Sequence, residues 1–135
     1  MHHGACLCGG VAYEIDGEIG PIVYCHCSMC QRWTGTAFRA RASVKKAEFR
    51  FLRGAELISE YRSSSNTIRR FCRVCGSPLV NSWDPEPDSY GLAIGTLATD
   101  PGHRPRCHIY VGSKAPWYEI TDRLPQFEAE PTRKK

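Results

Sequence analysis

Apolar and β-branched residues gather along the chain in short runs, and glycine, proline or serine separates one run from the next. Runs of about five residues with turn residues between them are typical of β-strands. Short strands at this spacing predict a mainly β fold, of the sandwich or barrel kind. The predicted strands are Val11–Ile15, Ile22–Tyr24, Phe38–Ala42, Glu48–Leu52, Thr67–Phe71, Tyr90–Ile94 and Cys107–Val111.

Helical patterning is weak by comparison. Ser28–Trp33 is the best helix candidate, with Ser28 as the predicted N-cap, whereas Ala55–Ser59 fits the strand and helix periods equally. The tail over residues 128–135 alternates in charge and has no apolar anchor, so we expect it to fray. Residues 1–127 are predicted to form a single domain, since about 100–150 residues is the commonest domain size.

Cysteine is the residue type that sets the composition apart. Of 135 residues, 41% are hydrophobic and 24% charged, both near the globular average, but eight are cysteines. No secretory signal pattern appears and no stretch approaches the ~18 apolar residues of a membrane span, so we expect a cytoplasmic protein without a membrane partner. Reducing conditions in that compartment favour metal ligation over disulfide bonds.

The formal net charge of +4 invites a nucleic-acid partner, but it counts every cysteine as neutral. If seven thiols ionise and two Zn²⁺ ions bind, seven negative and four positive charges are added, and the sum falls to +1. The basic pairs at residues 45–46 and 69–70 are too brief for the extended stripe that nucleic acid requires. We therefore do not expect nucleic acid as a partner.

Seven of the eight cysteines stand in three clusters. Tetrahedral zinc, with Zn–S bonds of about 2.3 Å, places its sulfurs roughly 3.8 Å apart, so its ligands must come from close positions. Residues i and i+2 of a strand face the same side, which lets the two cysteines of a C-x-C pair reach one ion. The clusters are Cys6 and Cys8, then Cys25, Cys27 and Cys30, then Cys72 and Cys75.

Counting ligands divides these clusters into two sites. A closed structural zinc site takes four protein ligands, and an open catalytic site commonly takes three, with water or substrate in the fourth position. Gly9 and Gly76 follow the two outer pairs, where a tight turn can aim backbone N–H groups at sulfur. We predict a closed structural site from Cys6, Cys8, Cys72 and Cys75, and an open catalytic site from Cys25, Cys27 and Cys30.

Other interpretations of these residues stay open. A redox dithiol at Cys72 and Cys75 requires a βαβ context that the predicted strands do not supply. Buried thiols explain one or two cysteines rather than three clusters, and Cys107, in an apolar run, is predicted to fill the core. His26 is expected to point away from the cysteines that flank it. His108 is better interpreted as a core histidine than as part of the open site.

Longer motifs surround the clusters. They span Gly4–Glu14, Cys25–Gly35, Arg70–Leu79 and His108–Trp117, followed by Leu124–Phe127. In this order they resemble the glutathione-dependent formaldehyde-activating enzyme family, which also includes centromere protein V. The resemblance implies a β-tent of folded antiparallel sheets as a zinc-binding domain. It also implies the same division into one structural and one catalytic zinc ion.

The resemblance further implies a carbon–sulfur lyase that handles a small thiol or its aldehyde adduct, of the glutathione and S-hydroxymethylglutathione type. The open position on the central zinc would hold sulfur as thiolate, and glutathione is a candidate cosubstrate. The alternatives are a carrier that binds glutathione without catalysis, and a non-enzymatic zinc module that binds protein or nucleic acid. The oligomeric state is left open.

Carboxylates on a glutathione-like substrate need cations, although most arginines and lysines are merely exposed. Aromatic residues near the motifs are candidates for cavity walls, although such residues more often fill cores. The cation candidates are Arg32, Arg39, Arg70 and Lys114, and the aromatic candidates are Trp33, Phe38 and Trp117.

Overall fold

The computed structural model describes residues 1–130, and its fold is mainly β, as predicted. Within these residues no helix has both the length and the hydrophobicity to cross a membrane. The α-helix is α1 (Ser28–Thr34), and 3₁₀ turns lie at Lys46–Glu48, Ala55–Leu57, Ile94–Thr96 and Val111–Ser113. The strands are β1 (His2–Ala5), β2 (Ala12–Ile15), β3 (Ile22–Cys25), β4 (Arg39–Lys45), β5 (Phe49–Arg53), β6 (Ile58–Ser64), β7 (Thr67–Cys72), β8 (Pro78–Trp83), β9 (Glu86–Ala93) and β10 (Cys107–Ile109).

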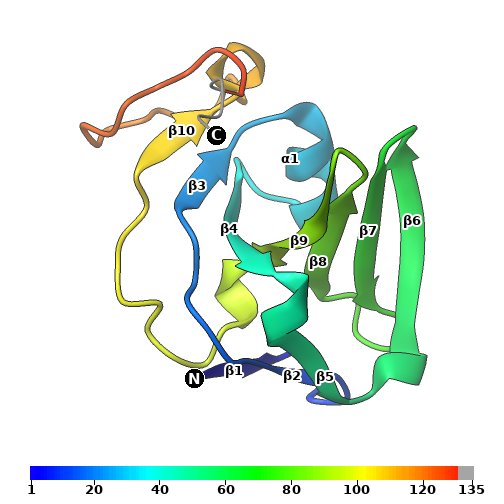
Figure 1. The fold of residues 1–135 in the computed structure, drawn as a ribbon. Coiled ribbons are helices and arrows are strands. Elements are labelled where there is room, and N and C mark those ends of the chain that lie inside the picture. The colour runs from blue at the N-terminus through cyan, green and yellow to red at the C-terminus, as the bar shows by residue number, and fades with distance from the viewer. Residues whose placement is uncertain (131–135) are drawn as a thin grey trace.

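These strands form two sheets (Figure 1). β1, β2 and β5 make a three-stranded antiparallel sheet near the N-terminus. The larger sheet has the order β10-β3-β4-β9-β8-β7-β6, and it is antiparallel except that β10 runs parallel to β3. The chain leaves the larger sheet after β4, adds β5 to the smaller one and returns in β6. Consecutive strands therefore tie the two sheets together.

The main hydrophobic core draws on both sheets. Burying one large apolar side chain contributes roughly 1.5–3 kcal/mol, so this cluster is what holds the small sheet against the large one. On β4 the core residues are Ala42 and Val44, which places the alternate positions of that strand on the opposite face. The core residues are Cys6, Val11, Tyr13, Ile15, Ile19, Ile22, Ala42, Val44, Phe49, Cys72, Leu79, Val80 and Leu92.

Each predicted strand overlaps an observed one, with shifted ends, but the prediction misses β1, β6 and β8. β1 reads His-His-Gly-Ala, which lacks the β-branched and aromatic residues that favour strands. β6 is an edge strand that pairs only with β7 and ends in serines that resemble a turn. β8 begins at Pro78, and proline is depleted in strands although their first position accepts it. The ambiguous segment Ala55–Ser59 divides into a 3₁₀ turn and the start of β6.

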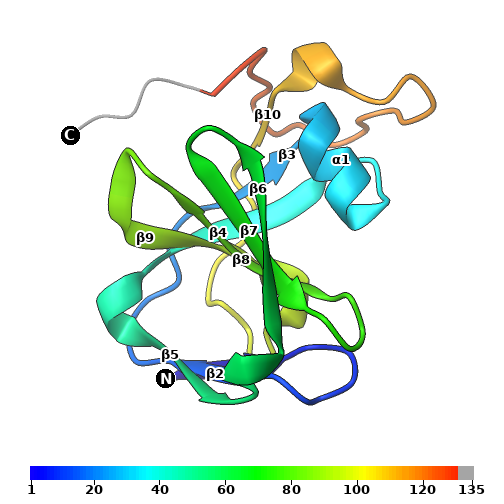
Figure 2. The same cartoon turned by 90° about the vertical axis from the view of Figure 1, so that its right-hand side faces the viewer.

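The larger sheet curls, as Figures 1 and 2 show together. β9 and β8 separate β4 from β7 in the sheet, yet residues of β4 and β7 line one cavity. α1 follows β3 at one end of the molecule, and the turn between β1 and β2 lies at the other end (Figure 1). The central and outer cysteine clusters are therefore far apart.

Candidate metal centres

The two outer cysteine pairs come together in the structure. The sulfurs of Cys6, Cys8, Cys72 and Cys75 all lie within 4.8 Å of one another. Cys6 and Cys8 follow β1, with their sulfurs 3.6 Å apart, and Cys72 ends β7 with its sulfur 3.9 Å from that of Cys8. Since thiolates around tetrahedral zinc are roughly 3.8 Å apart, these four donors fit a closed zinc site.

Backbone N–H groups reach two of these sulfurs. Gly10 N donates to Cys8 Sγ at 3.4 Å, and Val11 N donates to Cys6 Sγ at 3.3 Å. Gly9 has a φ of 77°, a left-handed conformation that a glycine adopts without steric cost, and it turns the chain back between the two cysteines and β2. These N–H groups offset negative charge on the sulfurs, as the predicted glycine turn requires.

Ser77 links the second pair to the first. Its hydroxyl lies 3.3 Å from Cys75 Sγ and accepts a hydrogen bond from Leu7 N at 2.9 Å. Hydrogen bonds from the Ser77 side chain and backbone, and from the Cys8 backbone, lower the pKa of Cys75 to about 5. The thiolate is the form that binds a metal, so the local chain prepares Cys75 as a ligand.

The central trio is built where β3 leads into α1. Cys25 ends β3, Cys27 precedes the helix and Cys30 lies in its first turn, and their sulfurs lie within 4.8 Å of one another. The predicted N-cap, Ser28, is wrong by one residue. The N-cap is Cys27, whose backbone is extended and whose sulfur accepts a hydrogen bond from Cys30 N at 3.3 Å. Sulfur thus satisfies an N–H that has no partner within the helix, and the bond fixes Cys27 beside Cys30.

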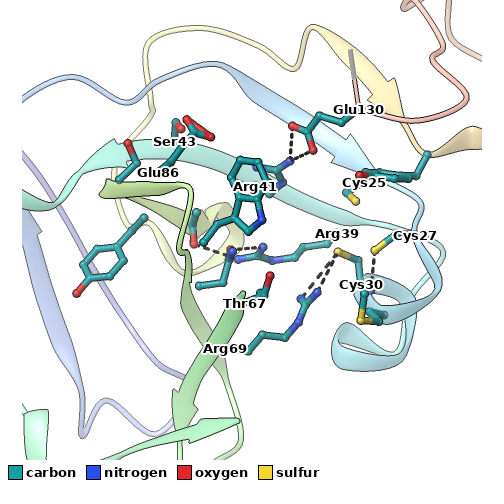
Figure 3. Close-up of a pocket in the computed structure, with 17 residues that line it drawn as sticks. Cys25, Cys27, Cys30, Arg39, Arg41, Ser43, Thr67, Arg69, Glu86 and Glu130 are labelled. Atoms are coloured by element: carbon teal, nitrogen blue, oxygen red, sulfur yellow. Dashed lines mark hydrogen bonds and ion pairs between the residues drawn. The ribbon is translucent and has the colours of Figure 1, made fainter. Parts of the chain in front are cut away.

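The trio opens onto a cavity of about 240 Å³ on one face of the curled sheet (Figure 3). All three cysteines line it. Side chains that alternate along β4 and β7 supply two of its walls, because residues i and i+2 of a strand share a face. The wall residues from these strands are Arg39, Arg41 and Ser43 on β4, and Thr67 and Arg69 on β7.

Arg39 is the most deeply buried cation of the cavity, with 2% of its surface exposed. It donates to Asn81 Oδ1 at 2.7 Å and to the Gly91 carbonyl at 3.1 Å. Its Nε has no hydrogen-bond partner among residues 1–130. Both acceptors are neutral, so nothing in these two contacts balances the guanidinium charge.

Arg69 faces the trio directly. It is 6% exposed, donates to Ser63 Oγ at 2.9 Å, and has both terminal nitrogens 3.9 Å from Cys30 Sγ. The Trp33 ring contacts both arginines, with its centroid 4.7 Å from the guanidinium carbon of Arg39 and 4.9 Å from that of Arg69. The ring attracts and orients both cations.

These arginines favour negative charge on the trio. Hydrogen bonds from Cys25 and Cys27, and then the charges of Arg39 and Arg69, lower the pKa of Cys30 to about 2. Hydrogen bonding to the other two sulfurs raises the pKa of Cys25. Burial lowers the pKa of Arg39 to about 10, which leaves it cationic at neutral pH.

Arg41 is the third arginine of the cavity, and it differs because it has a carboxylate partner. Its Nη2 lies 3.2 Å from Glu130 Oε1. Glu130 belongs to the tail that we predicted to fray, and residues 131–135 of that tail lie outside the described residues.

Of the cations selected from the sequence, only Arg39 lines the cavity. Arg70 pairs with Glu60 at 2.7 Å, and Arg32 is exposed. Lys114 donates to two backbone carbonyls of its own loop. The sequence motifs therefore identified one arginine of the cavity, Arg39, but did not distinguish it from the three candidates that lie elsewhere.

The three aromatic candidates, Trp33, Phe38 and Trp117, do not line the cavity. Sequence reasoning also missed Arg41 and Arg69. A signal for Arg41 was present, since it stands two residues after Arg39 on a predicted strand and so shares its face. No local pattern marks Arg69, because the curl of the sheet is what brings β7 opposite β4.

A chain of hydrogen bonds that runs from two buried histidines to the exposed Asp122 supports the segment from Cys25 to Cys27. His26 Nε2 lies 2.8 Å from His108 Nδ1, and His108 Nε2 lies 2.9 Å from Asp122 Oδ2. Because a carboxylate accepts, His108 donates to Asp122 through Nε2, and its Nδ1 can then accept from His26 Nε2. Both histidines are buried and neither lines the cavity, as predicted. Cys107, expected in the core, is buried in a cluster with Cys25 and Cys30.

Replacing His26 with leucine is expected to lower the free energy of unfolding by about 1–3 kcal/mol, because His108 Nδ1 then stays buried without a donor. Denaturant unfolding measures the loss. The matched control is His3→Leu on β1, whose exposed side chain should change stability by less than about 0.5 kcal/mol. Equal effects of the two substitutions would show that the hydrogen-bonded chain does not stabilise the fold.

Known proteins are similar to this chain. A family model described as glutathione-dependent formaldehyde-activating enzyme matches residues 1–113. A Schizosaccharomyces pombe protein named as an uncharacterized lyase is 31% identical over 123 residues, and the match covers 70% of this chain and 88% of that protein. The crystal structure of a Rhodobacter sphaeroides protein is similar with a TM-score of 0.63 and 27% identity, over 76% of this chain and 97% of the other. These matches confirm the family resemblance and the prediction of an enzyme: the chain belongs to the glutathione-dependent formaldehyde-activating enzyme family, a family of lyases.

Proposed function

We propose that this protein is a zinc-dependent carbon–sulfur lyase that acts on the aldehyde adduct of a small thiol, of the S-hydroxymethylglutathione type. The observation that carries the proposal is the placement of the central trio. Three sulfurs converge on the wall of a cavity, and within residues 1–130 no fourth cysteine, histidine or carboxylate belongs to their group. An ion held there would keep one position open toward a ligand in the cavity.

The proposal assigns the seven clustered cysteines to two ions in one domain over residues 1–127. Cys6, Cys8, Cys72 and Cys75 would hold a structural zinc, and Cys25, Cys27 and Cys30 would hold the catalytic one. Thiolate donors suit zinc, and only sulfur donors are present in either group. Zinc bound by the trio would supply Lewis acidity toward sulfur.

A cationic residue of the protein would stabilise the negative charge that develops on sulfur during the reaction. In the cleavage direction the C–S bond of the hydroxymethyl adduct breaks, its electron pair remains on sulfur, and the hydroxyl proton passes to water as the aldehyde C=O bond forms. Arg69 lies beside the sulfurs of the trio and would stabilise negative charge that appears there. Its buried setting strengthens this interaction, because little water is present to screen it.

Metal counting followed by Co²⁺ substitution tests the proposal. We expect two zinc ions per chain in protein purified under reducing conditions. After replacement of zinc by Co²⁺, added glutathione should change the visible spectrum, because a thiol enters the open position. One ion per chain, or a spectrum that no thiol changes, would contradict the assignment of the trio.

A thiol carrier would give the same spectral change, so turnover must be measured separately. Release of formaldehyde from the adduct of formaldehyde with glutathione, at a rate proportional to the enzyme concentration, would identify a catalyst. Tight binding without release would identify a carrier and contradict the lyase proposal.

A further inference from the structure

Arg39 and Arg69 are buried cations that have no carboxylate partner in the described part of the chain. Within residues 1–130 the ion pairs of arginine involve Arg41, Arg50, Arg62, Arg70 and Arg104, and neither of these two. A buried charge is costly unless an opposite charge compensates it. Trp33 and neutral oxygens supply only part of that compensation.

The balance of charge near the trio stays positive even with a metal ion bound. Three thiolates and one divalent ion sum to one negative charge, whereas Arg39 and Arg69 together carry two positive charges. Arg41 is matched by Glu130, and Glu86 lies on the far side of the cavity from the cysteines (Figure 3). A substrate thiolate bound at the trio would balance this sum, so a carboxylate beside the two arginines has to be favoured by their remaining hydrogen-bonding groups and not by net charge alone.

Hydrogen-bonding capacity remains on both arginines. Arg39 Nε is buried, has no partner among the described residues, and belongs to a residue that lines the cavity. The terminal nitrogens of Arg69 approach the Cys30 sulfur only at 3.9 Å, which is long for a hydrogen bond and leaves them able to bind a closer acceptor. A carboxylate matches the planar guanidinium group in geometry and in charge.

The geometry points to Arg39 and Arg69 as residues that determine specificity by binding a carboxylate on the substrate, so that the cavity selects thiols with a carboxylate over neutral and cationic thiols. This inference rests on the proposed function, because it takes the thiol of the same substrate to be bound at the trio. The 3.9 Å between Arg69 and Cys30 Sγ means that a short carbon chain can join the two groups.

Binding of three thiols of similar size tests the selection. Co²⁺-substituted protein is titrated with 3-mercaptopropionate, 2-mercaptoethanol and cysteamine, and dissociation constants are taken from the visible spectrum. A charge-assisted hydrogen bond stabilises by about 1.5–3 kcal/mol, so we expect 3-mercaptopropionate to bind roughly 10- to 100-fold more tightly than 2-mercaptoethanol. Cysteamine should bind more weakly than either.

Variants of Arg69 test whether this residue causes the preference for 3-mercaptopropionate. Arg69→Gln should reduce the preference for 3-mercaptopropionate to within about threefold, whereas Arg69→Lys should keep only part of it, because the charge remains but the planar two-nitrogen contact with a carboxylate is lost. Since the same thiols are compared on each variant, differences in their own acidity cancel. The matched control is Arg62→Gln on neighbouring β6, whose exposed side chain lies outside the cavity and should leave the preference unchanged.

The outcomes separate this inference from the proposed function. If no thiol changes the spectrum, the assignment of the trio fails. If all three thiols bind equally well to the unmodified protein, the trio stands and the carboxylate selection is wrong. A folded Arg69→Gln variant that keeps the full preference would also contradict it. If that variant does not fold, the order of the three thiol affinities on the unmodified protein still decides whether the cavity selects a carboxylate.

Discussion

Replacing Cys72 with alanine is expected to unfold most of the protein and to remove one zinc ion. Cys72 is completely buried at the end of β7, where its sulfur joins those of Cys6 and Cys8 from the turn that connects β1 and β2 of the smaller sheet. Structural zinc binds with an apparent free energy of about 10–16 kcal/mol in small peptides, whereas a whole domain is stable by only about 5–15 kcal/mol. Losing a ligand at this junction can therefore cost the fold. Circular dichroism and zinc analysis measure the result.

Cys107→Ala is the matched control for that prediction. Cys107 is also a buried cysteine, but it belongs to neither group of converging sulfurs. Removing its single sulfur atom should cost about 1 kcal/mol and leave the zinc content unchanged, since small core deletions have effects of that size. If Cys72→Ala were no more destabilising than this control, the outer cluster would not hold a structural metal.

Replacing Cys30 with serine is expected to abolish turnover while the fold survives. The substitution removes one of three sulfurs at the cavity and the sulfur that Arg69 faces. Lewis-acid stabilisation of several kcal/mol corresponds to at least about a 10³-fold loss of kcat/KM, because each 1.4 kcal/mol is tenfold. The glutathione-dependent change of the Co²⁺ spectrum should disappear as well.

The outer cluster provides an internal control for Cys30→Ser. Its sulfurs lie at the other end of the molecule, so the variant should still bind one zinc ion per chain and unfold cooperatively. A Cys30→Ser protein that retained two ions, the spectral response and full turnover would show that the trio is not the catalytic site.

The pairing of distant cysteines could be predicted from the sequence because zinc chemistry limits the choices. Two pairs and one trio divide in few ways into sites with four and three ligands, and the structure brings together the same two groups of sulfurs. Their role as zinc ligands stays a prediction. Most strands could also be predicted, because β-branched residues between glycines and prolines mark them locally.

The cavity could not be predicted, because it depends on the path of the whole sheet. Arg39 and Arg69 are thirty positions apart, on strands that are not neighbours, and the curl of the sheet brings both of them into contact with the Trp33 ring. The parallel pairing of β10 with β3 is equally non-local, and it places His108 against His26. The N-cap of α1 is a third feature that the sequence did not predict correctly. Serine has the better capping propensity, but the cap is Cys27, because its position in the trio fixes where the helix begins.

β7 carries both Arg69 and Cys72. Three residues of extended chain span roughly 10 Å, so Arg69, which faces the trio, and Cys72, a member of the outer cluster, lie about that far apart on one strand. Loss of the metal that the outer cysteines would hold is therefore expected to disturb the position of Arg69 together with the fold, although the trio lies at the other end of the molecule. The structural zinc proposed for the outer cluster would thus also help to position a cation at the other site, through a single strand.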